Sequence, residues 1–94
     1  MGLIVQKFGG TSVKDRDRIF NVARIVANTR NQGNDVVVVV SAQGDTTDDL
    51  ITKAAEITSD PSHREMDMLL ATGEQISISL LAMALQAVSY THLT

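Results

Sequence analysis

Residues 36–40 read Val-Val-Val-Val-Val, and this unbroken β-branched run decides the fold. A strand without polar and apolar alternation is typical of a parallel sheet that is covered on both faces. Upstream, residues 15–32 repeat apolar residues at the spacing of one helical face, at Ile19, Val22, Ala23 and Val26. Residues 3–8 are also β-rich and end at a glycine pair. Strand, helix and strand make a βαβ unit, so we predict an α/β fold with a mainly parallel sheet.

Local signals set the expected ends of the helices. Ser12, followed by Asp15, resembles a capping box before the first helix, and Gly33 supplies its C-terminal stop. Two more helices are predicted over residues 48–58 and 64–88, and the longer one has a candidate break at Thr72-Gly73. Two strands do not make a stable doubly covered sheet, so the predicted domain is either incomplete or needs a partner that supplies the missing strands.

Composition argues against several classes of function. The net charge is -3 and the eight Lys and Arg residues are scattered, so no nucleic-acid partner is expected. Cysteine is absent, which leaves no thiolate nucleophile or cysteine-ligated metal. The most apolar stretch, residues 76–88, is too short to span a bilayer, and the first residues do not resemble a signal peptide. We therefore expect a cytoplasmic protein with no membrane partner.

The first candidate site follows the first strand. Lys7 is placed near the strand's carboxyl end, where open α/β sheets bind ligands. Gly9 and Gly10 would let the backbone approach a phosphate, and Thr11 and Ser12 precede a helix start that favours an anion. The alternative is an ordinary strand-to-helix turn with a solvated lysine, and the spacing alone leaves both open.

The second candidate site follows the valine run. Residues 41–47 read Ser-Ala-Gln-Gly-Asp-Thr-Thr, and their hydroxyls and amides could hold a carboxylate beside the first loop. The alternative is helix capping by Thr46 or Thr47. Asp45, Asp48 and Asp49 fit first-turn carboxylates that complement a helix dipole better than metal ligands, so no protein-bound metal is predicted.

Glu74 is the third candidate. At helical spacing it shares a stripe with Leu70, Ile78 and Leu81, where a carboxylate is costly to bury unless it is paired. A substrate ammonium group could be its partner. The alternative is a boundary glutamate that pairs with an Arg or Lys of this chain.

Three segments together resemble one family. Residues 7–13 (Lys-Phe-Gly-Gly-Thr-Ser-Val), 38–48 and 64–74 (ending Ala-Thr-Gly-Glu) are similar, in order and spacing, to the conserved blocks of aspartate kinases. The resemblance covers residues 2 to about 88. It implies that residues 1–88 are the N-terminal part of an amino-acid kinase αβα sandwich, and it leaves residues 89–94 as an unmatched tail.

The resemblance also implies a reaction. ATP, bound with Mg²⁺, would phosphorylate the side-chain carboxylate of L-aspartate, the first step of lysine, threonine and methionine synthesis. Lys7 would be catalytic and would hold the ATP phosphates with Gly9, Gly10, Thr11 and Ser12. Ser41, Thr47 and Glu74 would bind aspartate, with Glu74 on its ammonium group.

The family's members are several times longer than this chain, and the full-length proteins are expected to be oligomeric. We expect the fragment to be inactive by itself. Two alternatives are kept: a non-catalytic fragment with at most weak phosphate binding, and another amino-acid kinase such as a glutamate 5-kinase.

Overall fold

The computed structural model describes residues 2–93, with side chains through Val88. Two strands pair in parallel, β1 (Leu3–Phe8) and β2 (Asp35–Val40), with Phe8 opposite Val40. The helices are α1 (Arg16–Asn31), α2 (Thr46–Ile57) and α3 (His63–Leu93), and a short 3-10 helix, η1 (Gly10–Val13), precedes α1. The predicted βαβ unit is confirmed.

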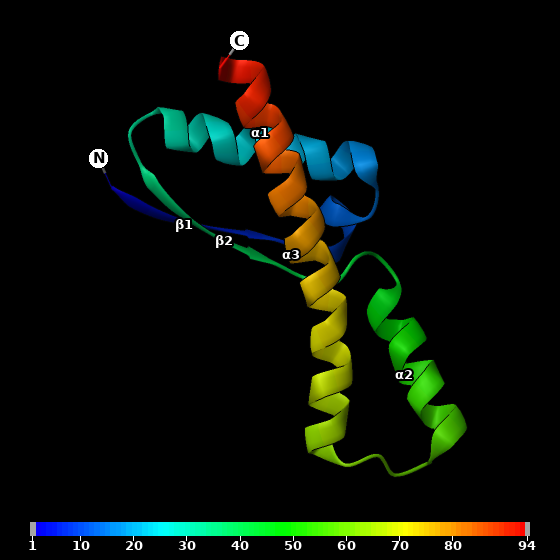
Figure 1. Cartoon of the computed structure of the whole chain (residues 1–94). Helices are drawn as coiled ribbons and strands as arrows, with labels where there is room; N and C mark the ends of the chain where they lie inside the picture. The colour runs from blue at the N-terminus through cyan, green and yellow to red at the C-terminus, as the bar shows by residue number, and fades with distance from the viewer. Residues whose placement is uncertain (1, 94) are drawn as a thin grey trace.

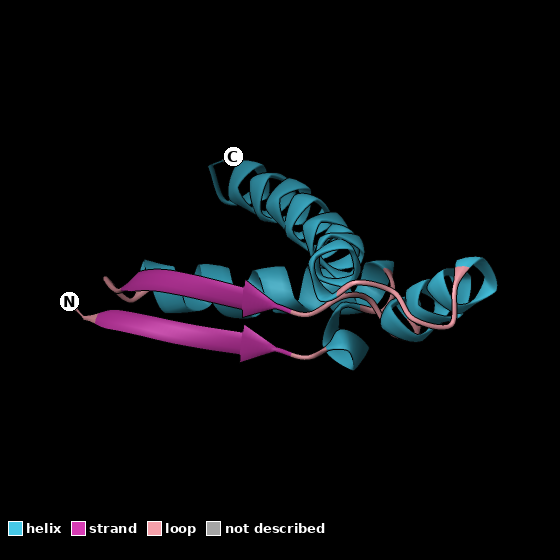
Figure 2. Ribbon diagram, turned by 90° about the horizontal axis from the view of Figure 1, so that it is seen from below, coloured by secondary structure: helices cyan, strands magenta, loops and turns pink. Residues whose placement is uncertain are grey.

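The elements form two connected parts. Helix α1 lies along one face of the two strands, and Figure 2 shows the strands in front of it. Helix α2 and the first half of α3 form a hairpin beyond the strand ends, and the second half of α3 crosses α1 (Figure 1). The Cα radius of gyration is 15.9 Å. A compact domain of this length would have a radius near ~12 Å, so the arrangement is extended.

The core lies between α1, β2 and the second half of α3. Helix α1 buries Ile19, Val22, Ala23 and Val26, which is the predicted face. Val13 of η1 and Val40 of β2 join it, together with Leu81 and Ala84 of α3. Each of these side chains is small or branched, so the core is built almost without aromatic residues.

The valine run is covered on one face only, which agrees with the prediction that this chain alone does not complete the sheet. Exposure alternates along both strands, and α1 covers only the face that carries Val36 and Val38. On the other face, Val5 is 63% exposed and its register partner Val37 is 48% exposed. The strands carry apolar residues on both faces, but α1 covers only one of them.

The predicted capping box at Ser12 is wrong. Ser12 lies inside η1, and Asp15 is itself the N-cap of α1, because its carboxylate accepts a hydrogen bond from the Arg18 amide at 3.0 Å. The C-terminal stop is confirmed: Gly33 has a φ of 92° and donates its amide to the Arg30 carbonyl at 3.0 Å. A left-handed residue after a helix is the usual glycine-dependent ending.

The predicted break at Thr72-Gly73 does not occur, and α3 continues through both residues. The Thr72 hydroxyl donates to the Leu69 carbonyl at 2.6 Å, within the helix. An 18-residue window within residues 63–88 has a mean hydropathy of 1.5, so α3 is the one helix of the described chain that is long and apolar enough to cross a membrane. Residues 76–88 alone are too short to span a bilayer, and the unbroken length of α3 corrects the expectation drawn from them. Core helices of globular proteins also meet that criterion.

Candidate functional site

Hydrogen bonds join the loops that follow the two strands. The Ser41 amide donates to the Phe8 carbonyl at 3.1 Å, and the Gly44 amide donates to the Gly10 carbonyl at 3.0 Å. The Gln43 side chain donates through Nε2 to the Val13 carbonyl at 2.9 Å. Two sequence segments that were predicted to lie side by side are therefore joined directly at the carboxyl ends of the strands.

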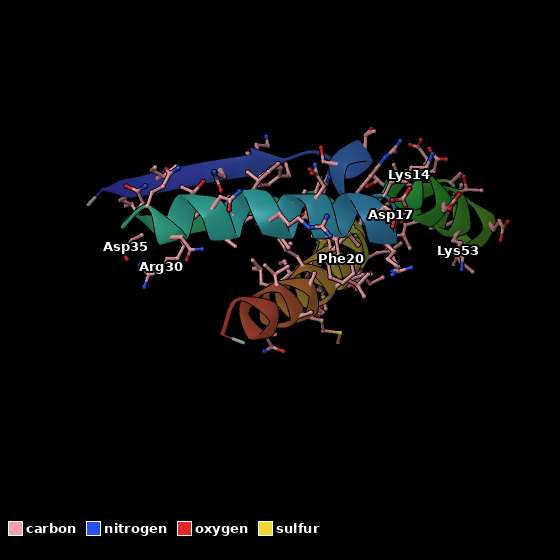
Figure 3. The ribbon with its side chains drawn as sticks, turned by 90° about the horizontal axis from the view of Figure 1, so that it is seen from above. Lys14, Asp17, Phe20, Arg30, Asp35 and Lys53 are labelled. Atoms are coloured by element: carbon pink, nitrogen blue, oxygen red, sulfur yellow. The ribbon has the colours of Figure 1, made fainter. Side chains whose placement is uncertain are left out.

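Lys7 lies near the carboxyl end of β1, and its side chain is on the strand face opposite to the one that α1 covers. It is exposed, and it makes no ion pair with any described residue. By contrast, Arg30 pairs with Asp35 through Nη1 and Oδ1 at 3.1 Å, at the opposite end of the strands (Figure 3). Lys7 is thus a cation that is free for a ligand, on the open side of the sheet.

The two glycines after β1 have different surroundings. A Cβ on Gly9 would meet nothing within 4 Å, so this position leaves open space above the backbone. A Cβ on Gly10 would lie 2.6 Å from the Ala42 carbonyl oxygen, which is closer than real Cβ atoms approach. Gly9 is therefore the position open to a ligand, whereas the second loop already requires a glycine at Gly10.

Thr11 and Ser12 are exposed in η1. The Ser12 amide already donates to the Gly9 carbonyl at 3.1 Å, and the Thr11 carbonyl accepts from Arg18 Nη1 at 3.4 Å. The Asp15 carboxylate occupies the N-terminus of α1. In this arrangement the hydroxyls of Thr11 and Ser12, more than the N-terminus of α1, are available to an anion.

The second loop places Ser41 and Thr47 on either side of its turn. Ser41 directly follows β2 and is partly buried, and Thr47 is exposed in the first turn of α2. Asp45 is the N-cap of α2 but makes no side-chain capping bond, so capping by Thr46 or Thr47 does not occur. Among the described residues, no group of three His, Cys, Asp or Glu side chains is placed to hold a metal ion.

Glu74 is exposed, and it forms no ion pair with an Arg or Lys among the described residues. The residue before it makes the close contact. Gly73 is buried, and a Cβ there would lie 3.0 Å from Ala42 Cβ and 3.2 Å from Thr46 Cγ2. Helix α3 thus touches the second loop between Ser41 and Thr47, with Glu74 next to the contact.

Sequence reasoning missed the residues that hold this arrangement together: Ala42, Gln43 and Gly73. For Gly73 a signal was available, because a glycine inside a helix costs about 1 kcal/mol relative to alanine. A glycine at such a position usually indicates close packing or a functional role. The bond from Gln43 to the Val13 carbonyl joins residues 30 apart in sequence, and no local pattern encodes it.

Two pockets of the described structure lie away from the main candidate residues. One pocket of about 290 Å³ lies between α1 and α3, and another of about 300 Å³ lies at the α2–α3 turn. Neither of these two pockets is lined by Lys7, Gly9 or Glu74.

Comparisons with known proteins show which family the chain resembles. The amino acid kinase family matches residues 2–93. The aspartokinase of Bacillus sp. (strain MGA3) is 62% identical over 97% of this chain, which spans 23% of that relative. Aspartokinase 2 of Bacillus subtilis (strain 168) is 59% identical over 97% of this chain, which spans 24% of that relative. The chain therefore spans less than a quarter of the length of these curated relatives.

A solved structure gives the same result. The crystal structure of aspartate kinase from Synechocystis superposes with a TM-score of 0.89 and 57% sequence identity, covering 92% of this chain and 15% of that one. The parallel strands and their helices match the N-terminal part of that protein. The chain therefore belongs to the amino acid kinase family, and it corresponds to the N-terminal part of an aspartate kinase.

Proposed function

We propose that this chain forms part of the phosphate and acceptor sites of an enzyme that transfers the γ-phosphoryl group of ATP to the side-chain carboxylate of L-aspartate. The observation that carries the proposal is the direct joining of the two strand-end loops, with Lys7 on one side and Glu74 on the other, neither of which forms an ion pair with a described residue. The names and identities of the relatives support aspartate as the acceptor.

The nucleotide side is built on β1 and its loop. The Lys7 ammonium group supplies positive charge for phosphate oxygens, and the open space above Gly9 admits a phosphate close to the backbone. Mg²⁺ bound with ATP would neutralise further charge on the phosphates. Mg²⁺ keeps few protein ligands when phosphates coordinate it, so it would not require a cluster of protein carboxylates here.

The acceptor side is built on the β2–α2 loop and α3. Ser41 and Thr47 provide hydroxyls for an aspartate carboxylate, and Glu74 provides a carboxylate for its ammonium group. An aspartate side chain has an ordinary pKa near ~3.9, so the nucleophile is already ionised at pH 7 and needs no general base. Its oxygen attacks the γ-phosphorus, the bond to the β–γ bridging oxygen breaks, and ADP leaves. The enzyme's part is alignment and charge neutralisation.

The test uses a complete protein, called here the composite protein. In it, residues 2–88 of this chain replace the matching segment of Bacillus subtilis aspartokinase 2. We expect ATP-dependent formation of aspartyl phosphate, trapped as the hydroxamate, and a fall in kcat of about 100-fold or more for Lys7→Ala, since this charge acts on the transferring group. Glu74→Gln should raise KM for aspartate and leave KM for ATP unchanged.

The result that contradicts the proposal is a folded composite protein that phosphorylates glutamate in preference to aspartate, or that phosphorylates neither. For the 94-residue chain alone, we expect at most weak Mg-ATP binding by calorimetry, because the rest of the site is supplied by other segments. Binding that Lys7→Ala leaves unchanged would remove Lys7 from the phosphate site.

A further inference from the structure

Gly73 makes the closest approach between α3 and the β2–α2 loop. A Cβ at this position would lie 3.0 Å from Ala42 Cβ, 3.2 Å from Thr46 Cγ2 and 3.5 Å from Leu50 Cδ1. The first two distances are shorter than ordinary van der Waals contact, so one added methyl group requires a neighbour to move. The helix backbone itself therefore forms the contact surface here.

The neighbouring turn of α3 is also closely packed. Ser77, one turn after Gly73, is fully buried, and its hydroxyl has no hydrogen-bond partner in the described structure. A glycine and a serine on successive turns allow a close approach at the expense of helix propensity. Protein interiors are closely packed, so a larger side chain at either position would push α3 away from its neighbours.

The two sides of the contact are not equally free to move. The β2–α2 loop is tied to β1 and η1 by the bonds from Ser41 to Phe8, from Gly44 to Gly10 and from Gln43 to Val13. No hydrogen bond in the described structure joins the first half of α3 to this loop. A methyl group at position 73 would therefore move α3 away from the loop and leave the two joined loops in place.

We propose that Gly73 is a positioning residue that sets the distance between Glu74 on α3 and the loop that carries Ser41 and Thr47. The proposal rests on the proposed function and adds a structural determinant of acceptor recognition. Glu74 follows Gly73 directly, so a shift of α3 carries its carboxylate away from an acceptor bound at the loop. Lys7 and Gly9 belong to the nucleotide side and make no contact with α3 through Gly73.

The experiment compares Gly73→Ala with the unsubstituted composite protein. We expect kcat/KM for aspartate to fall about 10-fold or more, as for other small misplacements of a binding group, and KM for ATP to stay unchanged. Ser79→Thr is the matched control, because it adds one methyl group at an exposed position of the same helix. It should leave both parameters unchanged.

A compensating variant separates positioning from general damage. Ala42→Gly combined with Gly73→Ala moves the methyl group from the loop to the helix and removes the 3.0 Å contact with Ala42 Cβ, the closer of the two short contacts. We expect it to recover most of the aspartate kcat/KM, which a merely destabilising substitution would not do. An unchanged aspartate KM in Gly73→Ala, equal losses for both substrates, or no recovery in the double variant would overturn the proposal. Failure of the unsubstituted composite protein to use aspartate would instead overturn the proposed function.

Discussion

At the scale of single residues, two adjacent glycines have separate tasks. Both were predicted to admit a phosphate, because neither has a side chain. The structure shows that Gly10 is required by the second loop, since its Cβ would collide with the Ala42 carbonyl, while Gly9 faces open space. One glycine therefore maintains the joined loops, and the other leaves room beside them.

This difference gives a paired prediction. Gly10→Ala should destabilise the 94-residue chain by about 1–3 kcal/mol, the range for overpacking against a rigid neighbour. Gly9→Ala should change the free energy of unfolding by no more than about 0.5 kcal/mol, because its φ of -76° suits alanine and the added methyl group meets no neighbour. Urea denaturation followed by circular dichroism measures both. Equal destabilisation by the two substitutions would show that the loops do not pack as described.

Residue-level motifs named the candidate residues but not the contacts that hold their segments together. The strand ends, the glycine pair and Glu74 were all visible in sequence. The contact of Gly73 with Ala42 and the bond from Gln43 to Val13 were not, because each depends on segments far apart in the chain. The helical stripe also could not show whether Glu74 pairs with a cation of the same chain, and in the structure it pairs with no described Arg or Lys.

At the scale of elements, the hydrophobic periodicity predicted which segments are helices and strands better than it predicted where each element begins and ends. The α1 face agrees with the predicted one because several regularly spaced apolar residues decide it together. The predicted range of α1, residues 15–32, includes its observed caps Asp15 and Gln32, but the capping role was assigned to Ser12. The choice between Ser12 and Asp15 depends on whether residues 10–13 form a separate 3-10 turn. The predicted break in α3 failed because packing on the second loop stabilises a helical glycine.

The cap of α1 can be tested by itself. Asp15→Ala removes the acceptor of the Arg18 amide and should lower the free energy of unfolding by about 1 kcal/mol. Asp15→Asn keeps a capping oxygen at the same position, so its stability should stay close to that of the original chain. If Ser12→Ala proves as costly as Asp15→Ala, the cap has been assigned to the wrong residue.

At the scale of the whole molecule, the unbroken valine run was a sound indication of a doubly covered sheet, but this chain covers only one face. The apolar residues left exposed on the other face belong to both strands: Leu3, Val5, Val37 and Val39. The chain spans 21–24% of the length of the curated relatives that it matches, and the rest of their length is where further cover is to be sought. The apolar residues on the open face therefore fit a sheet that further segments, such as those of the longer relatives, would cover.

An uncovered parallel sheet should make the isolated chain self-associate through that face, because exposed apolar patches and strand edges pair readily. Val5→Thr combined with Val37→Thr makes the open face more polar while keeping β-branched residues, so we expect less association by sedimentation velocity and an unchanged circular dichroism spectrum.

Val38→Thr is the matched control, since Val38 packs on the core from the covered face. Burying its hydroxyl without a partner should cost about 1–3 kcal/mol of stability and should not reduce association. If the double variant associates as strongly as the original chain, the open face is not the surface through which the molecules meet, and the α2–α3 hairpin with its exposed Ile57 becomes the next surface to test.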